Sequence, residues 1–310
     1  MRVLITGANG MLATNIIEEL IAQGYSVRGI LRNKSRYKGI INHNLELIEG
    51  DFCNLGTIEQ AITDCNYVIH TAAITAQNIH SYKTYKRVNV DATEQLLQVA
   101  IAAKVSRFLY VSTANTIGFG TPQSPSDESK PMVEQFTKSM YARSKKEAED
   151  IVLSYKDSID VIVANPTLMI GRYGSASGSN RILKMIRRIV IIPNGGKNFI
   201  DVIEASRACV AALQRGRNGE KYLICGENMS YKEFFNLFTR VQNIITLPNI
   251  IIHIIGILGD SLRFFGINVD FSLTNMKMLS TRVCYSNKKL RTELGYNAKQ
   301  LIDSDIAKYS

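Results

Sequence analysis

Short apolar runs alternate with helical patterns along the first half of the chain, and this alternation constrains the fold more than any other feature. The runs are "RVLIT", "YSVRGIL", "LELIEG", "NYVIHTAA", "SRFLYVST" and "SIDVIVANP", separated by segments with helical spacing. Buried parallel strands joined by amphipathic helices give this pattern. Right-handed crossovers between such strands build a doubly wound sheet. The sequence therefore predicts an α/β protein with a Rossmann-type parallel sheet.

The rhythm loosens after Pro166. "GRYGSASGSN" reads as a loop, "RILKMIRRIVI" as a helix, and "KYLICG" as a seventh strand that returns to the sheet. "SYKEFFNLFTRV" has helical spacing with Ser230 as its N-cap. We expect a main domain over residues 1–166 with a returning segment at about 199–229. Residues 167–198 and 230–310 should form a smaller, mostly helical C-terminal lobe that binds a small-molecule substrate over the strand ends.

Composition excludes several classes of protein. The 310 residues carry a net charge of +10, but Lys and Arg are spread along the chain and no nucleic-acid-binding motif accompanies them, so we expect no nucleic-acid partner. Five cysteines without a CxxC pair fit reduced thiols in a cytoplasmic protein. The four histidines show no metal-ligand spacing, and His70, inside an apolar run, is expected to be structural. "MRVLITGANG" reaches glycine too soon for a signal peptide.

The most apolar segment, "IITLPNIIIHIIGIL" at Ile244–Leu258, is too short to span a bilayer. A buried or substrate-lining helix is the first interpretation. Weak contact with a membrane surface is the alternative.

The glycine-rich stretch "TGANGMLA" follows the first predicted strand and opens a helix. Gly7 permits a tight turn, Gly10 permits close approach of a pyrophosphate, and the small Ala13 lets the helix pack close to the sheet. The helix N-terminus would then face the anion with free N–H groups and its positive dipole end. A plain tight turn between strand and helix is the alternative. The position of the motif favours a dinucleotide site.

The tip of the second strand distinguishes the two nicotinamide dinucleotides. NAD sites place an acidic residue there, yet no Asp or Glu occurs between Glu19 and Glu46. Arg32 stands at this tip, followed by Lys34, Arg36 and Lys38, and a guanidinium suits a 2′-phosphate. NADP(H) is favoured, NAD(H) is possible, and a solvated basic loop remains an alternative.

"YARSK" places Tyr141 and Lys145 four residues apart on one face of a predicted helix. A phenol titrates near a pKa of about 10, and a nearby ammonium would lower that pKa enough for proton transfer near neutrality. The fifth strand ends with Ser112 and Thr113, either of which could hold a substrate oxygen. Strand alternation allows only one of the two to face the cleft.

Together these motifs resemble the extended short-chain dehydrogenase/reductase family, also called the NAD(P)-dependent epimerase/dehydratase family. "TGANGMLA", "TAA", "YVST", "YARSK" and the Asn165–Pro166 pair occur in its order and approximate spacing. "GYSVRGILRNKSR", "FIDVIEAS" and "YSNKKLRTELGY" look most like dihydroflavonol 4-reductases and their bacterial relatives. Ala13 departs from the glycine that is commoner in extended members.

The resemblance implies a role for each matching position. Thr113, Tyr141 and Lys145 would be catalytic, with Thr113 as the hydroxyl and Ser112 as its neighbour. Asn89, in "VNVDAT", matches a supporting asparagine. The expected cofactor-binding residues are Thr6, Gly7, Asn9, Gly10, Met11, Leu12, Arg32, Lys38, Asp51, Phe52, Thr71, Ala72, Ala73, Asn89, Lys145, Pro166 and Thr167. A homodimer formed by the helices beginning near Asn89 and Tyr141 is a further expectation from the family.

The implied activity is NADP(H)-dependent reduction of a ketone, or oxidation of a secondary alcohol, on a small apolar substrate of the dihydroflavonol or hydroxysteroid kind. The first alternative is a nucleotide-sugar 4-epimerase with retained NAD. Sugar dehydratases of this family commonly carry an Asp–Glu pair where Ala114 and Asn115 follow Thr113, so elimination is disfavoured. The second alternative is a catalytically silent dinucleotide sensor or scaffold.

Overall fold

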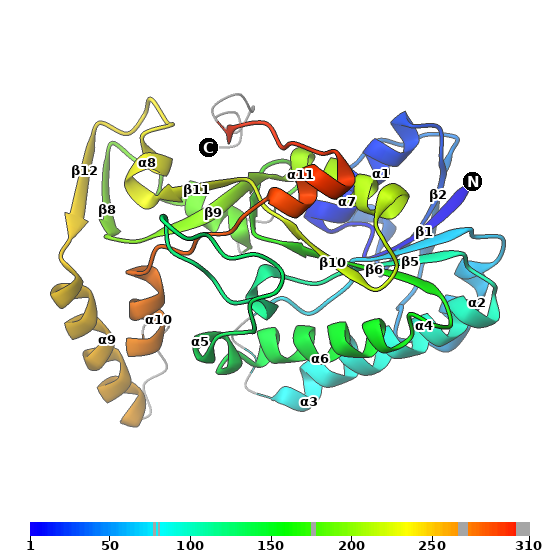
Figure 1. Cartoon of the computed structure of the whole chain (residues 1–310), viewed down its shortest axis with the longest axis horizontal. Coiled ribbons are helices and arrows are strands. Elements are labelled where there is room, and N and C mark those ends of the chain that lie inside the picture. Colours follow the sequence, from blue (N-terminus) through cyan, green and yellow to red (C-terminus); the bar gives the residue numbers. More distant parts are fainter. Residues whose placement is uncertain (77–78, 80, 175–177, 266–271, 302–310) are drawn as a thin grey trace.

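A seven-stranded parallel sheet forms the centre of the computed structural model, which describes residues 1–76, 79, 81–174, 178–265 and 272–301. The strand order is β10-β6-β5-β4-β1-β2-β3 (Figure 1). The strands span Arg2–Thr6 (β1), Ser26–Leu31 (β2), Leu45–Glu49 (β3), Tyr67–His70 (β4), Arg107–Val111 (β5), Asp160–Pro166 (β6) and Glu220–Ile224 (β10). The predicted Rossmann-type α/β fold is confirmed.

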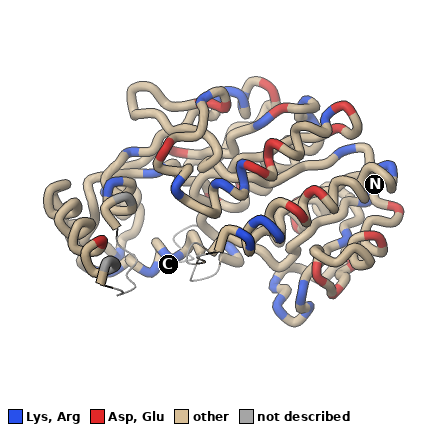
Figure 2. The backbone as a smooth tube through the Cα atoms, turned by 90° about the horizontal axis from the view of Figure 1, so that it is seen from below, with Lys and Arg blue, Asp and Glu red and all other residues tan. Residues whose placement is uncertain are grey.

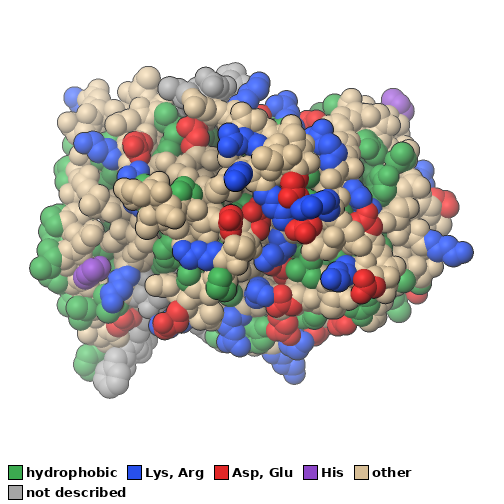
Figure 3. Space-filling model, viewed as in Figure 1, with side chains coloured by type: hydrophobic (Ala, Val, Ile, Leu, Met, Phe, Trp, Pro, Cys, Tyr) green, Lys and Arg blue, Asp and Glu red, His purple; other side chains and the backbone are tan. Residues whose placement is uncertain are grey.

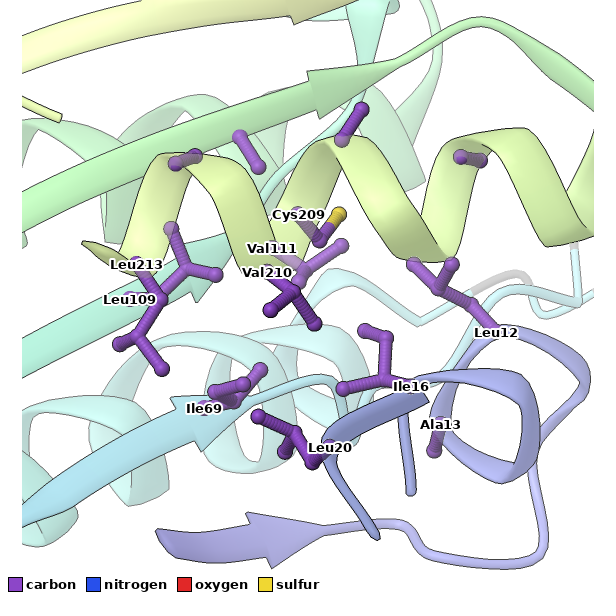
Figure 4. Close-up of a cluster of buried hydrophobic side chains, with 14 of the residues drawn as sticks. Leu12, Ala13, Ile16, Leu20, Ile69, Leu109, Val111, Cys209, Val210 and Leu213 are labelled. Atoms are coloured by element: carbon purple, nitrogen blue, oxygen red, sulfur yellow. The ribbon is translucent and has the colours of Figure 1, made fainter. Parts of the chain in front are cut away.

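Helices cover both faces of this sheet because neighbouring strand residues point to opposite sides. One face packs against α1 (Met11–Ala22), α7 (Val202–Arg215) and α11 (Lys288–Leu294). The other packs against α2 (Leu55–Ile62), α4 (Ala92–Ala102) and α6 (Met140–Ser154). In β1, Val3 and Ile5 belong to the first core and Leu4 to the second. Figure 4 shows Leu12, Ile16 and Leu20 of α1 in the first core, below α7.

The order in which strands are added to the sheet reverses its direction at β1. The chain passes from β1 outward to β2 and β3, then returns to β4 on the other side of β1. Ligands bind doubly wound sheets at such a switch point, at the carboxyl ends of the strands. Thr6 and His70 therefore end the two strands that flank the expected site.

The connections beyond the strand ends contain several short helical turns. These include η1 (Lys34–Arg36), α3 (Tyr82–Tyr85), η3 (Ala114–Thr116) and α5 (Glu134–Thr137). A π-helix, η2 (Lys86–Asp91), joins α3 to α4 and contains Asn89. Single π-helical turns occur frequently at functional sites.

A smaller lobe lies at the carboxyl end of the sheet. It contains a three-stranded sheet of β7 (Leu168–Ile170), β9 (Gly196–Asp201) and β11 (Glu227–Ser230), and a two-stranded sheet of β8 (Ile189–Pro193) and β12 (Asn243–Leu247). Its helices are η4 (Ser179–Met185), α8 (Tyr231–Phe235), α9 (Asn249–Phe264) and α10 (Leu273–Leu279). These small sheets were not predicted. The domain boundaries stay a prediction, although α7 and β10 do return to the main sheet.

Two local predictions in the lobe are wrong. "RILKMIRRIVI" is not one helix, because η4 ends at Met185 and β8 begins at Ile189. The β-branched run Ile189–Ile192 favours a strand, with Val190 and Ile192 buried and Ile189 and Ile191 exposed. The Ile244–Leu258 segment is likewise a strand and a helix separated by Pro248, which cannot supply a backbone N–H. Ser230 caps α8 as predicted, with Glu233 completing a capping box.

No helix in the described part of the chain is long and apolar enough to cross a membrane. Its described His, Cys, Asp and Glu residues form no group that could hold a metal ion.

Candidate active site

The glycine-rich turn between β1 and α1 has the shape that a pyrophosphate requires. Gly7 has a φ of +69°, and a Cβ at this position would lie 3.0 Å from the Ala72 Cα. Gly10 is the N-cap of α1 and provides no side-chain hydrogen bond to the helix. The first N–H groups of α1 are therefore not capped by a side chain at this position. These residues fit a dinucleotide phosphate group.

Buried hydrogen bonds of Thr6 and His70, which end β1 and β4, hold this turn in place. The fully buried Thr6 hydroxyl lies 2.6 Å from His70 Nδ1 and accepts a bond from the Ala72 N–H at 3.2 Å. His70 Nε2 lies 2.9 Å from the Thr93 hydroxyl. Burial lowers the pKa of His70 to about 3, so the ring is neutral. His70 is the structural residue that the sequence predicts, and the side chain of Thr6 serves the same scaffold.

Other predicted cofactor-binding residues lie along the same edge of the sheet. Asn9 is exposed, Met11 is half-buried, and Leu12 is buried in the core, so Leu12 offers its backbone rather than its side chain. Thr71 donates its hydroxyl to the Thr6 carbonyl at 2.6 Å. Ala73 is half-buried beside Ala72. Small side chains here leave room above β4 for a flat ligand.

Basic residues surround the tip of β2. Arg32 and Lys38 are exposed. Arg32 and Arg87 both act to lower the pKa of the Cys53 thiol, although burial raises that pKa to about 12 overall. Both guanidinium groups therefore lie near the loop after β3, which also contains Asp51 and Phe52. Arg87, in the π-helix, was not predicted from the sequence.

One acidic residue also lies near this tip. Glu49, the last residue of β3, pairs with Leu31 of β2, and its carboxylate accepts the Lys34 N–H at 2.8 Å. Glu49 could not be predicted from the residues of the second strand, because it belongs to the neighbouring strand.

Thr113 and Tyr141 meet at the end of β5. Thr113 is the N-cap of η3, and its hydroxyl lies close enough to the phenol of Tyr141, near the N-terminus of α6, to affect the pKa of that phenol. Burial raises the pKa of Tyr141 to about 12, an effect that Thr113 opposes and Tyr85 reinforces. The expected lowering of this pKa by Lys145 is therefore not found. The phenol is protonated at neutral pH.

Lys145, one helical turn after Tyr141 on α6, is buried. Its ammonium donates to the Val111 carbonyl at 2.8 Å and lies 4.1 Å from the centre of the Tyr110 ring. Burial lowers the pKa of Lys145 to about 7, although the carboxylate of Glu149 acts in the opposite direction. The amine can change protonation near neutral pH, which suits a group involved in proton transfer.

Ser112 points away from Thr113, as strand alternation requires. Its hydroxyl donates to the buried carboxylate of Glu149 at 2.7 Å. The same carboxylate oxygen accepts from Thr116 at 2.7 Å and from Asn165 Nδ2 at 2.8 Å. Asn165 also donates to the Thr113 carbonyl at 3.2 Å. Glu149 thus joins α6 to the ends of β5 and β6, and it fixes the backbone that presents Thr113.

Sequence reasoning missed Glu149, although one signal was present. Glu149 follows Lys145 by four residues and Tyr141 by eight, so all three share one helix face. A carboxyl group on the face expected to be buried was the available sign. Its partners come from distant strands and could not be inferred from spacing.

The buried side chain of Asn89 holds the backbone around the candidate site in place rather than lining that site. Its buried amide accepts from the Ile74 N–H at 2.7 Å and donates to the Ile74 carbonyl at 3.1 Å and to the Ser144 hydroxyl at 3.0 Å. It therefore ties the loop after β4 to α6. Pro166 is buried at the end of β6, and the Thr167 hydroxyl donates to Asn198 Oδ1 at 2.8 Å.

Comparison with known proteins identifies the family. A family model described as "NAD dependent epimerase/dehydratase family" matches residues 3–225. The chain belongs to this family. It is an enzyme of the NAD(P)-dependent dehydrogenase/reductase class, and its fold and glycine-rich turn serve a nicotinamide dinucleotide.

Individual relatives agree with this assignment. The chain is 28% identical to a putative dihydroflavonol 4-reductase of Synechocystis over 79% of its own length and 72% of the relative's. It is 26% identical to the sterol demethylase protein B of Methylococcus capsulatus, covering 95% and 93% of the two chains. A solved dTDP-glucose 4,6-dehydratase of Streptomyces venezuelae, with NAD and TYD bound, shares the fold, with a TM-score of 0.76, 20% identity and coverage of 100% and 95%.

Replacing Glu149 tests its structural role. Glu149→Ala would remove the acceptor that three buried donors share and the partner of Lys221, so we expect the free energy of unfolding to fall by about 3–5 kcal/mol in urea denaturation. Asp150→Ala is the matched control, because Asp150 is exposed and pairs with Lys146 at the surface. This control should cost less than about 1 kcal/mol. Equal losses for the two variants would contradict the assignment.

Proposed function

We propose that the protein reduces a ketone, or oxidises the corresponding secondary alcohol, on a small apolar substrate with NADP(H). The observation that carries the proposal is the approach of the Thr113 hydroxyl to the Tyr141 phenol, one helical turn from the buried Lys145. The two hydroxyl groups are close enough to bind one substrate oxygen together. The names of the relatives, which include a dihydroflavonol reductase and a sterol demethylase protein, support an apolar substrate.

The bound dinucleotide would supply or accept the hydride, and the protein would position the substrate and move a proton. Thr113 would hold the substrate oxygen by a hydrogen bond. Tyr141, protonated at neutral pH, would donate its proton to that oxygen as negative charge develops. Lys145 would stabilise the resulting phenolate by its charge. The raised pKa of Tyr141 suits proton donation, and hence the reductive direction, at neutral pH.

Binding of NADP(H) would use both ends of the cofactor-binding edge. Gly7, Gly10 and the N-terminus of α1 would hold the pyrophosphate. Arg32 would bind the 2′-phosphate in a charge-assisted pair, within the positive potential of Arg87 and Lys38. The adenine would lie between this tip and the Asp51–Phe52 segment.

Glu49 favours the second candidate, an epimerase that retains NAD. Its carboxylate lies beside the tip of β2, and a modest shift of the Lys34 loop would free it to bind ribose hydroxyl groups. The two candidates differ in net chemistry: an epimerase returns its cofactor to the starting redox state, whereas a reductase consumes NADPH. Purified protein that carries NAD and interconverts nucleotide sugars would favour the epimerase.

Turnover assays test the proposed reaction. Incubation with NADPH and a panel of flavanonols, steroid ketones and smaller ketones should show loss of absorbance at the nicotinamide band. Tyr141→Phe should lower kcat by about 10²–10⁴-fold because the proton donor is removed, with unchanged dinucleotide affinity. Tyr155→Phe, which alters a phenol at the other end of the same helix, should keep parental turnover. Parental kcat in Tyr141→Phe would refute the assigned acid, and NADPH binding without turnover on any compound would favour a sensor.

The cofactor preference has its own test. Arg32→Ala should weaken NADPH binding by about 10–100-fold, the contribution of a charge-assisted hydrogen bond, and leave NADH binding nearly unchanged. Titration calorimetry with both dinucleotides measures the effect. Arg215→Ala, at an exposed arginine that ends α7, controls for the loss of one positive charge. Parental protein that binds NADH more tightly than NADPH would contradict the preference.

A further inference from the structure

Helix α9 places its small residues against the protein. Ile252, Gly256 and Gly259 are buried on its inner face, where α10 lies alongside. A Cβ on Gly256 would come within 2.7 Å of the Leu273 Cα of α10. Close packing of the two helices therefore requires glycine at this position. Most of the large apolar side chains of α9 lie outside this contact with α10.

Five large apolar side chains of α9 point outward instead. Ile250, Ile251, Ile254, Ile257 and Leu258 are 41–70% exposed. Their spacing places them on one helix face. In Figure 2, α9 is the nearly all-tan helix at the left end of the molecule, and Figure 3 shows hydrophobic side chains gathered at the same end. Contiguous apolar surface of this kind marks a docking site.

Strands β8 and β12 extend the apolar surface beyond α9. Ile189 and Ile191 of β8 are each 54% exposed, and Ile245 of β12 is 49% exposed. Both strands lie at the same end of the molecule as α9 and α10 (Figure 1). We call this end, residues 179–193, 231–265 and 272–279, the apolar end.

The apolar end is also basic. Its sequence contains eight Lys and Arg residues but only two acids, Glu233 and Asp260. Glu233 pairs with Arg282 at 3.0 Å, and the Asp260 carboxylate accepts the Leu273 N–H at 3.0 Å. The exposed basic residues are Arg181, Lys184, Arg187, Arg188, Lys232, Arg240 and Lys277. The surface around the isoleucines is therefore positive.

We propose that the apolar end docks on the surface of an anionic lipid bilayer, with the outer face of α9 inserted at the level of the headgroups. Apolar insertion and attraction to anionic lipids would act together in this arrangement. A second copy of the chain fits less well as the partner. A two-fold contact through this surface would bring the same basic residues against each other.

Docking would bring the bilayer close to the candidate active site. Met278 of α10 packs in a cluster that contains Ala114 and Ile117, which closely follow Thr113. The inserted helix is thus separated by one helix from the segment that presents Thr113. Access of an apolar substrate from the bilayer rests on the proposed function, whereas docking itself does not.

Vesicle sedimentation tests the proposal with the full chain. The protein should pellet with phosphatidylcholine vesicles that contain phosphatidylglycerol, and much less with phosphatidylcholine alone or at high salt. The triple variant Ile250→Ser/Ile254→Ser/Ile257→Ser should bind at least about tenfold more weakly. Ile40→Ser/Ile41→Ser/Leu55→Ser, which alters exposed apolar residues elsewhere, should bind as the parent does.

Further variants test how much surface charge contributes to vesicle binding, and they control for loss of folding and loss of catalysis. Arg187→Gln/Arg188→Gln/Lys277→Gln should weaken binding to anionic vesicles, whereas Lys104→Gln/Lys156→Gln/Lys288→Gln should not. Unchanged thermal unfolding of each variant shows that the fold is intact. Tyr141→Phe should bind vesicles normally even if the proposed reaction is wrong. Parental protein that stays in the supernatant with anionic vesicles would overturn the proposal. So would a triple isoleucine variant that binds normally, or one whose only change is conversion of a dimer to a monomer.

Discussion

The buried carboxylate of Glu149 is the interaction on which the candidate site depends. It accepts hydrogen bonds from Ser112, Thr116 and Asn165, which come from the ends of two strands. Its own helix carries Tyr141 and Lys145. A charge in such a place is costly unless it is fully hydrogen bonded. Three donors satisfy one carboxylate oxygen, and the second, which has no hydrogen-bond partner among the described residues, is compensated by the Lys221 ammonium at 3.6 Å. The relative position of Thr113 and Tyr141 follows from this arrangement.

Burial also sets the protonation of the groups that would react. It raises the pKa of Tyr141 and lowers that of Lys145, so at neutral pH the phenol holds its proton and the amine is near its midpoint. From the sequence, Lys145 is expected to act as a charge that lowers the pKa of the phenol. In the folded protein, loss of hydration is the largest cause of the pKa shift of both groups.

Much of the main domain could be predicted from the sequence because its signals are local. Gly7, Gly10 and Ala13 lie within seven consecutive residues, and most strands of the sheet are short segments rich in apolar residues. The lobe could not be predicted in the same way. Ile189–Ile192 has both strand and helix interpretations until Val190 and Ile192 are known to be buried, and Glu149 and Asn89 acquire their roles through partners distant in the sequence. The exposed face of α9 has the composition of a core helix, so only the fold reveals that it points outward.

The central claim is that Thr113, Tyr141 and Lys145 converge on one nicotinamide ring. A crystal structure of the protein with NADP⁺ measures this most directly. The account predicts the Tyr141 hydroxyl and the Thr113 hydroxyl beside the reactive face of the ring, with the Lys145 ammonium within hydrogen-bond distance of the nicotinamide ribose. A ring bound far from Tyr141, with the phenol directed away from it, would contradict the account.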